Sequence, residues 1–319
     1  MKTIGFPVTR KENENRRVLT LESLRLIEKP ENVFIESGYG EVIGISDEDY
    51  RTLKAKIVKR EKVFEQDIVC NHKAGSPSEF DAFKEGQIIF GWIHAVQGRA
   101  ITEFFIENKL TGYAWEDMYY KGRHVFWENN VIAGEAALIH ALTIWGRIDN
   151  GVKVAVIGRG NIAQGAIRYA EKLGFSVDIY NRHMESLLRE NVDKYDIIVN
   201  GVLWDTSRKD HILYVDDVKR MKPGAMIVDI SCDDRMAIET SYPTSFENPT
   251  FVAHGVLHYV VDHTPSLLYK TASKSISMLL PKYINQLMKD MPDADLQKAK
   301  IFEDGKIIDD RIKKFQNRD

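Results

Sequence analysis

A glycine-rich turn is the segment whose residue types and spacing point most directly to chemistry. The run VAVIGRGNIAQGA places Gly158, Gly160 and Ala163 in a GxGxxA pattern, after a β-branched run and before a helical one. The first glycine permits a tight turn, the second lets the backbone approach a pyrophosphate, and the small third residue allows close helix-on-strand packing. The N–H groups that begin the helix attract an anion. We therefore predict a dinucleotide site made by Gly158, Arg159, Gly160, Asn161 and Ile162.

An acid is missing from the strand that follows this turn. The stretch SVDIYNRH, residues 176–183, ends in Asn181 and Arg182, where NAD-binding folds carry an Asp or Glu that grips the adenosine ribose. A carboxylate there would repel the additional phosphate of NADP. Asn181 can contact the ribose instead, and Arg182, together with Arg159, can pair with the phosphate. The strand end therefore predicts NADP (NADPH) rather than NAD. The alternatives are that Arg182 is a solvated loop charge and that the turn has lost its ligand.

Length and composition exclude several classes of protein. The chain has 319 residues, 44% of them hydrophobic, which is enough for two domains with separate cores. Its formal charge of -3 gives no global field that would attract nucleic acid or an anionic membrane. Cys70 and Cys232 lie far apart, which favours a reduced, cytoplasmic protein with both thiols buried. We find no signal peptide and no run of the roughly 20 apolar residues that a membrane span needs.

Alternating apolar runs and helical patterns predict an α/β chain. Short strands are expected at residues 3–8, 32–37, 67–72, 87–94, 196–202, 225–231 and 249–255. Helices are expected at residues 19–28, 130–145 and 265–289, the last crossing back to pack on the first domain. We therefore predict two Rossmann-like doubly wound domains with an interdomain active-site cleft. Residues 1–129 plus 270–319 would form the substrate (catalytic) domain, and residues 130–269 the NADP-binding domain.

Five further segments follow one another along the chain. They read ENENRRVLTL, NHKAGSPSEF, EGQIIFGWIHA, VKRMKPGAMIVDISCDD and ETSYPTSFENPTFVAHGVLHYVVDHTP. In this order they resemble the alanine dehydrogenase and transhydrogenase N-terminal family over nearly the whole chain. Within that family, the short length, the NADP-type strand end and the KENENRR start are most similar to members that join a 2-oxo acid to a basic amino acid.

The resemblance implies where an oxo acid is held. In the family an arginine near the N-terminus and a lysine after the fourth strand clamp its carboxylate, and these positions are Arg16 and Lys73. A bidentate guanidinium and a point charge would fix the orientation of a molecule as small as pyruvate. If the alignment with the family is shifted by one residue, Arg17 takes the place of Arg16. Otherwise we expect Arg17 to be exposed. The alternative is that either arginine pairs with a surface acid.

The resemblance also implies two catalytic residues. His94, at the end of IIFGWIH, corresponds to the family's general acid/base, and an imidazole exchanges protons readily near neutral pH. Asp233, after VDIS, corresponds to a second ionisable residue that positions the reacting nitrogen or relays its proton. The alternatives are a core histidine and a helix-capping aspartate.

The sequence departs from the family after Asp233. Alanine dehydrogenases carry a glycine pair there, whereas this chain has Asp234 and Arg235. An amino acid that delivers its side-chain amine also brings a carboxylate and an ammonium group. We expect Arg235 to meet the carboxylate and Asp234 or Asp262 to meet the ammonium; alternatively, Arg235 is exposed and pairs with Glu239. Residues 115–130 also depart from the family, and no functional residue is assigned there.

The segment HGVLHYVVDHTP raises the question of a metal. It places His254 and His258 four residues apart, a spacing that can bind zinc on a helix. No third ligand is evident, and the resemblance makes this segment a loop on the nicotinamide side, so we predict no metal. Asp262 and His263 are expected to reach the nicotinamide or the substrate.

Together these features predict an NADP-dependent oxidoreductase that acts on CH–NH bonds. The expected reaction is the reductive condensation of pyruvate with the side-chain amine of ornithine or lysine, through an imine, to an N-(1-carboxyethyl) amino acid. The expected partners are small molecules, with no nucleic acid and no membrane, and the resemblance implies a homo-oligomer. The alternatives are an alanine dehydrogenase that uses ammonia, a saccharopine-type dehydrogenase that uses 2-oxoglutarate, and a non-catalytic NADP-binding protein.

Overall fold

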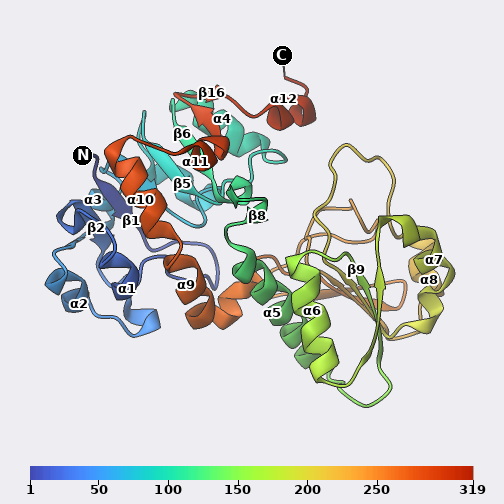
Figure 1. Ribbon diagram of the computed structural model, residues 1–319. Helices are drawn as coiled ribbons and strands as arrows, with labels where there is room; N and C mark the ends of the chain where they lie inside the picture. Colours follow the sequence, from blue (N-terminus) through green and yellow to red (C-terminus); the bar gives the residue numbers. More distant parts are fainter. Residues whose placement is uncertain (319) are drawn as a thin grey trace. The chain divides into compact units, whose positions relative to one another are not determined.

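The computed structural model describes residues 1–318 and divides the chain into two compact units. Unit 1 comprises Met1–Trp127 and the residues from Tyr269 onward, and unit 2 comprises Glu128–Leu268. The unit boundaries fall at 127/128 and 268/269, against the expected 129/130 and 269/270. Each unit is an α/β layer structure built on its own sheet (Figure 1).

The sheet of unit 1 has the strand order β16-β15-β6-β5-β4-β1-β2-β3. The six strands from β6 to β3 in this order are parallel. At the other edge β15 pairs antiparallel with β6, and β16 pairs antiparallel with β15. The strands are β1 (Ile4–Phe6), β2 (Val33–Glu36), β3 (Lys56–Val58), β4 (Ile68–Cys70), β5 (Ile88–Gly91), β6 (Thr111–Ala114), β15 (Lys300–Glu303) and β16 (Lys306–Ile307). A separate hairpin consists of β7 (Tyr119–Tyr120) and β8 (Arg123–His124).

Helices cover both faces of this sheet. They are α1 (Leu21–Leu24), α2 (Asp47–Thr52), α3 (Arg60–Val63), α4 (Arg99–Glu107), α9 (Tyr269–Ser277), α10 (Leu280–Lys289), α11 (Ala294–Lys298) and α12 (Asp310–Gln316). Successive strand residues point to opposite faces. Phe90 accordingly packs in one core with Leu280 and Ile284 of α10, whereas Ile89 packs in the other core with Phe105 of α4. The expected return of the C-terminal helical segment to the first domain is therefore confirmed.

Unit 2 has the strand order β10-β9-β11-β12-β14-β13, with β13 antiparallel to the rest. The strands are β9 (Lys153–Ile157), β10 (Ser176–Tyr180), β11 (Ile197–Asn200), β12 (Met226–Asp229), β13 (Thr250–Ala253) and β14 (Val256–Tyr259). The helices are α5 (Trp127–Trp145), α6 (Asn161–Lys172), α7 (Glu185–Glu190) and α8 (Val215–Arg220). The strands β9, β11 and β12 are almost continuous apolar runs because they are covered on both faces. The predicted fold class of two Rossmann-like doubly wound domains is confirmed.

Two predicted helices differ from the structure. The helix expected at 265–289 is a short 3-10 helix, η7 (Thr264–Leu268), followed by α9 and α10. Pro281 lies in the first turn of α10, where its missing N–H and its ring prevent continuation from α9. The helix expected at 19–28 is reduced to α1. Beyond α1 the backbone forms 3-10-type turns, because the N–H groups of Leu26 and Ile27 donate to carbonyls three residues back.

Helices α5 and α6 approach each other closely at two glycines. A Cβ added to Gly134 would lie 1.9 Å from the carbonyl oxygen of Ile162, and one added to Gly165 would lie 2.0 Å from that of Val131. A side chain fits at neither position. Because Ile162 belongs to the first turn of α6, this contact fixes the end of the helix that meets the glycine-rich turn.

We expect Gly134→Val to destabilise unit 2 by about 1 to 3 kcal/mol, because the added carbons push α6 away from α5. The midpoint of thermal unfolding measures the effect. The control is Thr143→Val on the exposed side of α5, which should change stability by no more than about 0.5 kcal/mol. Equal stability of the Gly134 and Thr143 variants would show that α5 and α6 can move apart without lowering the stability of unit 2.

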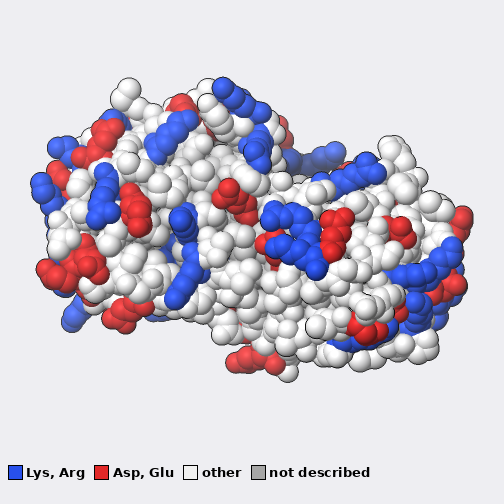
Figure 2. Space-filling model, turned by 60° about the horizontal axis from the view of Figure 1, so that its bottom comes forward, with Lys and Arg blue, Asp and Glu red and all other residues white. Residues whose placement is uncertain are grey.

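Two observations concern the sequence-based exclusion of membrane and nucleic-acid partners. No helix among residues 1–318 is both long and apolar enough to cross a bilayer. On the face shown in Figure 2, basic and acidic side chains are interspersed over the surface.

Candidate active site

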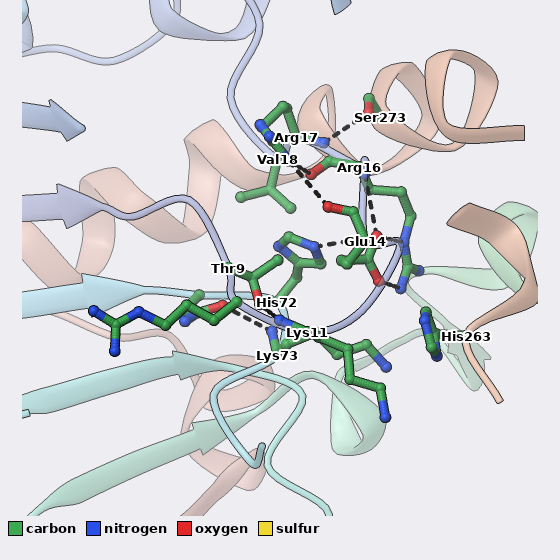
Figure 3. Close-up of polar contacts among 12 residues, drawn as sticks. Thr9, Lys11, Glu14, Arg16, Arg17, Val18, His72, Lys73, His263 and Ser273 are labelled. Carbon is green, nitrogen blue, oxygen red and sulfur yellow. Dashed lines mark hydrogen bonds and ion pairs between the residues drawn. The ribbon is translucent and has the colours of Figure 1, made fainter. Parts of the chain in front are cut away.

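The loop that follows β1 buries opposite charges. Glu14 and Arg16 are 5% and 2% exposed. Arg16 donates through Nε to Glu14 Oε1 at 2.8 Å and through Nη2 to Glu14 Oε2 (Figure 3). His72 Nε2, from the loop after β4, lies 3.5 Å from Glu14 Oε1. Arg16 thus pairs with a buried acid, which contradicts the alternative of a surface pair.

Burial and ion pairing fix the protonation of this cluster. Burial by itself raises the pKa of Glu14, but Arg16 and His72 hold that pKa well below its ordinary value. Burial lowers the pKa of His72 from 6.5 to about 4, although the Glu14 carboxylate acts in the opposite direction. At neutral pH, Glu14 is therefore a carboxylate and His72 a neutral imidazole.

We expect the stability of unit 1 to fall as the pH is lowered from 6.5 to about 4. Unfolded His72 takes up a proton near 6.5 and native His72 only near 4, so in this window the unfolded chain binds more protons and is favoured. The loss amounts to about 3 kcal/mol for a shift of this size. Glu14 adds to this loss at lower pH. Its stabilisation of the folded state is fully present above the ordinary glutamate pKa and is lost as the pH falls through the lower pKa of folded Glu14.

Urea unfolding of unit 1 at a series of pH values measures this dependence. His72→Gln should flatten the curve, because the glutamine does not titrate, whereas His183→Gln at an exposed position should leave it unchanged. A wild-type curve that is flat between pH 6.5 and 4 would contradict the assignment of a neutral, buried His72.

Arg17 lies in the interior, and the expectation that it is exposed is wrong. It is 6% exposed. Its backbone N–H donates to Ser273 Oγ of α9 at 2.8 Å, and its guanidinium donates to the carbonyls of Arg16 and Tyr39. The guanidinium also lies 5.4 Å from the Tyr39 ring centroid. Arg17 is buried because α9 returns from the far end of the chain to cover the loop.

Lys73 lies in the loop that leaves the carboxyl end of β4, next to β1 in the sheet. Asn71, which is buried, accepts the backbone N–H of Lys73 with its Oδ1 at 2.9 Å. Gly75 donates to the carbonyl of Trp92 at 3.1 Å, and a Cβ at Gly75 would lie 2.0 Å from the carbonyl oxygen of Ile93. The Lys73 loop is therefore held against the residues that precede His94.

His94 follows β5 and faces solvent. Its side chain is 66% exposed, which contradicts the alternative of a core histidine. Its backbone is left-handed, with φ of 53°, a conformation uncommon for residues other than glycine. The carboxylate of Glu116 accepts the N–H groups of Ile93 at 3.2 Å and of His94 at 2.5 Å. His94 Nδ1 lies 4.0 Å from the same carboxylate.

Glu116 was not among the residues predicted from the sequence. It belongs to a 3-10 helix, η4 (Trp115–Asp117), directly after β6, so it starts at the same sheet edge as the His94 loop. Its position after the strand TGYA was the one available signal, because the carboxyl ends of neighbouring parallel strands meet at one edge.

The glycine-rich turn of unit 2 has the features of a phosphate-binding turn. Gly158 has φ of 106°, and a Cβ there would come within 3.2 Å of Val202. Gly160 is the N-cap residue of α6, and a Cβ there would meet nothing within 4 Å, so open space lies next to the helix N-terminus. Ala163 is fully buried and packs against Gly201. The strand, the turn and the unobstructed helix start fit a pyrophosphate.

The end of β10 carries Asn181 and Arg182 as expected. Asn181 caps a 3-10 helix, η5 (Arg182–Met184), and its Oδ1 accepts the His183 N–H at 2.9 Å. One lone pair of Asn181 is therefore already engaged. The Arg182 side chain is 69% exposed and lies 3.9 Å from Asp205, a distance too long for a hydrogen bond. Arg159 is also exposed.

Asp233 follows β12 in a loop without helices. No helix begins between Asp233 and Ser241, which contradicts the helix-capping alternative. Hydrogen bonds to the buried carboxylate of Asp229 hold the two ends of this loop together. Asp229 accepts from Asn200 Nδ2 at 2.9 Å and from Ser241 Oγ at 2.5 Å. Burial raises the pKa of Asp229. Ser241 in turn accepts the N–H of Arg235 at 2.7 Å with its carbonyl oxygen.

Cys232, next to Asp233, is only partly buried, so the expectation that both thiols are buried holds for Cys70 alone. Cys232 lies in a left-handed turn beyond the carboxyl end of β12, with φ of 57°, and is not part of that strand.

Arg235 does not pair with Glu239. Its side chain is 74% exposed and lies 3.9 Å from Asp234, while Glu239 accepts the backbone N–H of Val215 at 2.8 Å. Arg235 and Glu239 line a cavity of about 550 Å³ within unit 2. The other residues that line it are His211, Val215, Thr240, Tyr242, Phe251, Val252 and Ala253.

The two histidines of HGVLHY lie on a β-hairpin, so their spacing does not place them on one helical face. His254 lies in the turn between β13 and β14, and His258 on β14 bonds to Thr240 Oγ1 at 2.8 Å. Among residues 1–318 no group of three or more His, Cys, Asp or Glu side chains is arranged to hold a metal ion. Asp262 and His263 follow β14 and are hydrogen-bonded to each other.

Comparison with known proteins identifies the family. The models "Alanine dehydrogenase/PNT, N-terminal domain" and "Alanine dehydrogenase/PNT, C-terminal domain" match residues 5–126 and 182–312. N(5)-(carboxyethyl)ornithine synthase of Clostridium botulinum (strain Hall) is 30% identical over 88% of this chain and 93% of its own length. The chain belongs to the alanine dehydrogenase/PNT family.

Other members of the alanine dehydrogenase/PNT family place the chain within it. N(5)-(carboxyethyl)ornithine synthase of Lactococcus lactis subsp. lactis is 31% identical over 79% of this chain and 85% of its own length. Alanine dehydrogenase of Methanococcus maripaludis is 27% identical over 86% of this chain and 84% of its own length. The solved structure of an L-alanine dehydrogenase has the same fold, with a TM-score of 0.82, 22% identity and coverage of 99% of both chains. As a family member, the chain is an oxidoreductase of the amino-acid dehydrogenase type that uses a pyridine nucleotide.

Proposed function

We propose that the chain catalyses the NADPH-dependent reductive condensation of pyruvate with the side-chain amine of ornithine or lysine. The product is an N-(1-carboxyethyl) amino acid. The similarity to N(5)-(carboxyethyl)ornithine synthases, at higher identity than to alanine dehydrogenases, supports this choice of reaction. A cytoplasmic location and a homo-oligomeric assembly are part of the proposal.

The buried charges of unit 1 are the observation that carries the proposal. The loop after β1 buries two guanidinium groups, Arg16 and Arg17, and one carboxylate, Glu14. A buried guanidinium requires anionic or hydrogen-bonding partners, and the carboxylate of an oxo acid is a suitable one. Glu14 occupies Nε and Nη2 of Arg16, which aligns the guanidinium plane, and Lys73 stands on the neighbouring loop. We assign Arg16 and Lys73 to the carboxylate of the oxo acid.

The glycine-rich turn of unit 2 is the proposed NADP site. Gly158, Arg159, Gly160, Asn161 and Ile162 would hold the pyrophosphate, since the α6 N-terminus is unobstructed at Gly160. Asn181 would contact the adenosine ribose, Arg182 would pair with the additional phosphate, and Asp262 would lie on the nicotinamide side. When bound, NADPH supplies the hydride that reduces the imine.

The proton transfers are assigned to two residues. The amine attacks the carbonyl carbon as a neutral nitrogen, and we assign Asp233 to relay the proton that this nitrogen loses. His94 donates a proton to the carbinolamine oxygen, so that water leaves and the imine forms. The exposure of the His94 imidazole, 66%, is compatible with exchange of that proton with solvent. We assign Arg235 to the carboxylate of the amino acid substrate, and Asp234 or Asp262 to its ammonium group.

An alanine dehydrogenase is the second candidate. The alanine dehydrogenase of Methanococcus maripaludis, which is 27% identical to this chain, favours it. It would use ammonia as the amine, and Arg235 would then have no substrate carboxylate to bind.

A matrix of oxo acids and amines, assayed with NADPH and NADH, separates these candidates. We expect the largest kcat/KM for pyruvate with ornithine or lysine and NADPH, with a product whose mass is that of the N-(1-carboxyethyl) amino acid. A preference for ammonia would favour an alanine dehydrogenase, and a preference for 2-oxoglutarate a saccharopine-type enzyme. Absence of NADPH oxidation with every pair would contradict an enzymatic role.

A further inference from the structure

The carboxylate of Glu116 lies next to His94 within unit 1. Strand β5 ends at Gly91, whose ladder partner is Ala114, so the ladder between β5 and β6 stops two residues before Ile93. The N–H groups of Ile93 and His94 therefore have no partner strand. Both donate to one side chain, at 3.2 Å to Glu116 Oε2 and at 2.5 Å to Glu116 Oε1.

We propose that Glu116 is a positioning residue that holds His94 in its left-handed conformation and thereby sets the direction of its imidazole. The proposal rests on the proposed function of His94. Glu116 fixes the N–H groups of both residues, and the φ of 53° at His94 then sets where its Cβ, and with it the imidazole, lies relative to them. A non-glycine residue keeps such a conformation only where its surroundings impose it. Glu116 Oε1 is also 4.0 Å from His94 Nδ1, so the same group lies beside the ring that it orients.

The other side of this loop is fastened independently. Gln316 of α12 donates through Nε2 to the carbonyl of Ala95 at 2.8 Å and to Thr102 Oγ1 at 2.9 Å. Thr102 Oγ1 also donates to the carbonyl of Gly98 at 3.1 Å. Loss of Glu116 should therefore release Ile93 and His94 without unfolding the loop that follows them.

Amide hydrogen exchange tests the contact without reference to activity. In Glu116→Gln one carboxylate oxygen becomes an NH₂ group that cannot accept, so exchange at Ile93 and His94 should accelerate by about tenfold or more. The amide of Asn71, which donates to Phe90 at 3.1 Å, serves as the internal reference and should not change. Glu107→Ala, at an exposed position on α4, is the matched control variant. Unchanged exchange at His94 in Glu116→Gln would overturn the proposal.

Steady-state kinetics test whether the contact acts through His94. We expect Glu116→Gln to lower kcat by about tenfold, with KM for pyruvate and for NADPH within about twofold of wild type, because the variant touches neither ligand. In a His94→Asn background the same change should have no further effect. An equal loss in both backgrounds, or an unchanged kcat in the single variant, would overturn the positioning role. If the wild-type chain has no activity, the proposed function fails, while the exchange result still decides whether Glu116 holds His94.

Discussion

The variant His94→Asn is expected to lower kcat by about 10²- to 10⁴-fold, the contribution typical of a positioned acid/base. Asparagine adopts the left-handed conformation of residue 94 readily and cannot exchange a proton at neutral pH, so the variant removes the chemistry and keeps the backbone. Binding of NADPH should not change, because the proposed cofactor site is built from unit 2. The measurements are the steady-state rate with pyruvate and ornithine or lysine, and the NADPH dissociation constant.

A matched control is available at His254. This histidine is exposed and left-handed like His94, with φ of 52°. It lies in the turn before β14, at the sheet edge opposite to the glycine-rich turn, so the expected nicotinamide-side position does not hold for His254. His254→Asn should leave kcat and KM unchanged. Retention of full turnover in His94→Asn would remove His94 from the mechanism, and equal losses in both variants would point to a general effect of losing an exposed imidazole.

The variant Arg182→Asp should weaken NADPH binding by about tenfold to a hundredfold, the range expected when one charge-assisted hydrogen bond is lost. Binding of NADH should not fall, because NADH has no phosphate at that position. The competing partner of Arg182 is weak, since Asp205 lies 3.9 Å away and is itself exposed. The guanidinium can therefore turn toward a phosphate at little cost. Titration of the protein with both reduced coenzymes measures the two dissociation constants.

Lys172→Asp is the matched control for this variant. It makes the same change of charge on the exposed end of α6, away from the turn at Gly160. A similar loss of NADPH affinity in both variants would indicate a long-range effect of net charge. Unchanged NADPH affinity in Arg182→Asp would remove the reason for preferring NADP to NAD.

Local patterns predicted much of the architecture. The strands β9, β11 and β12 are almost continuous apolar runs. The residues expected to function, such as Gly158, Asn181 and Asp233, follow the carboxyl ends of β9, β10 and β12. The return of α10 to unit 1 followed from its amphipathic pattern after the last strand of unit 2. The helix expected at residues 265–289 was wrong because one helical pattern was extended across a proline. Pro281 was visible in the sequence, and its lack of an N–H divides the C-terminal segment into α9 and α10.

The sequence by itself determined the elements and the residue types at their ends, because strand, turn and helix propensities act over a few neighbouring residues. The tertiary structure alone decided which charges meet. Arg17 became a buried residue because α9, more than 250 positions later, covers it with Ser273. The partner of His94 is Glu116, 22 positions away, because β5 and β6 are adjacent in the sheet. Such pairings depend on sheet order and side-chain distance, and neither is encoded in local spacing.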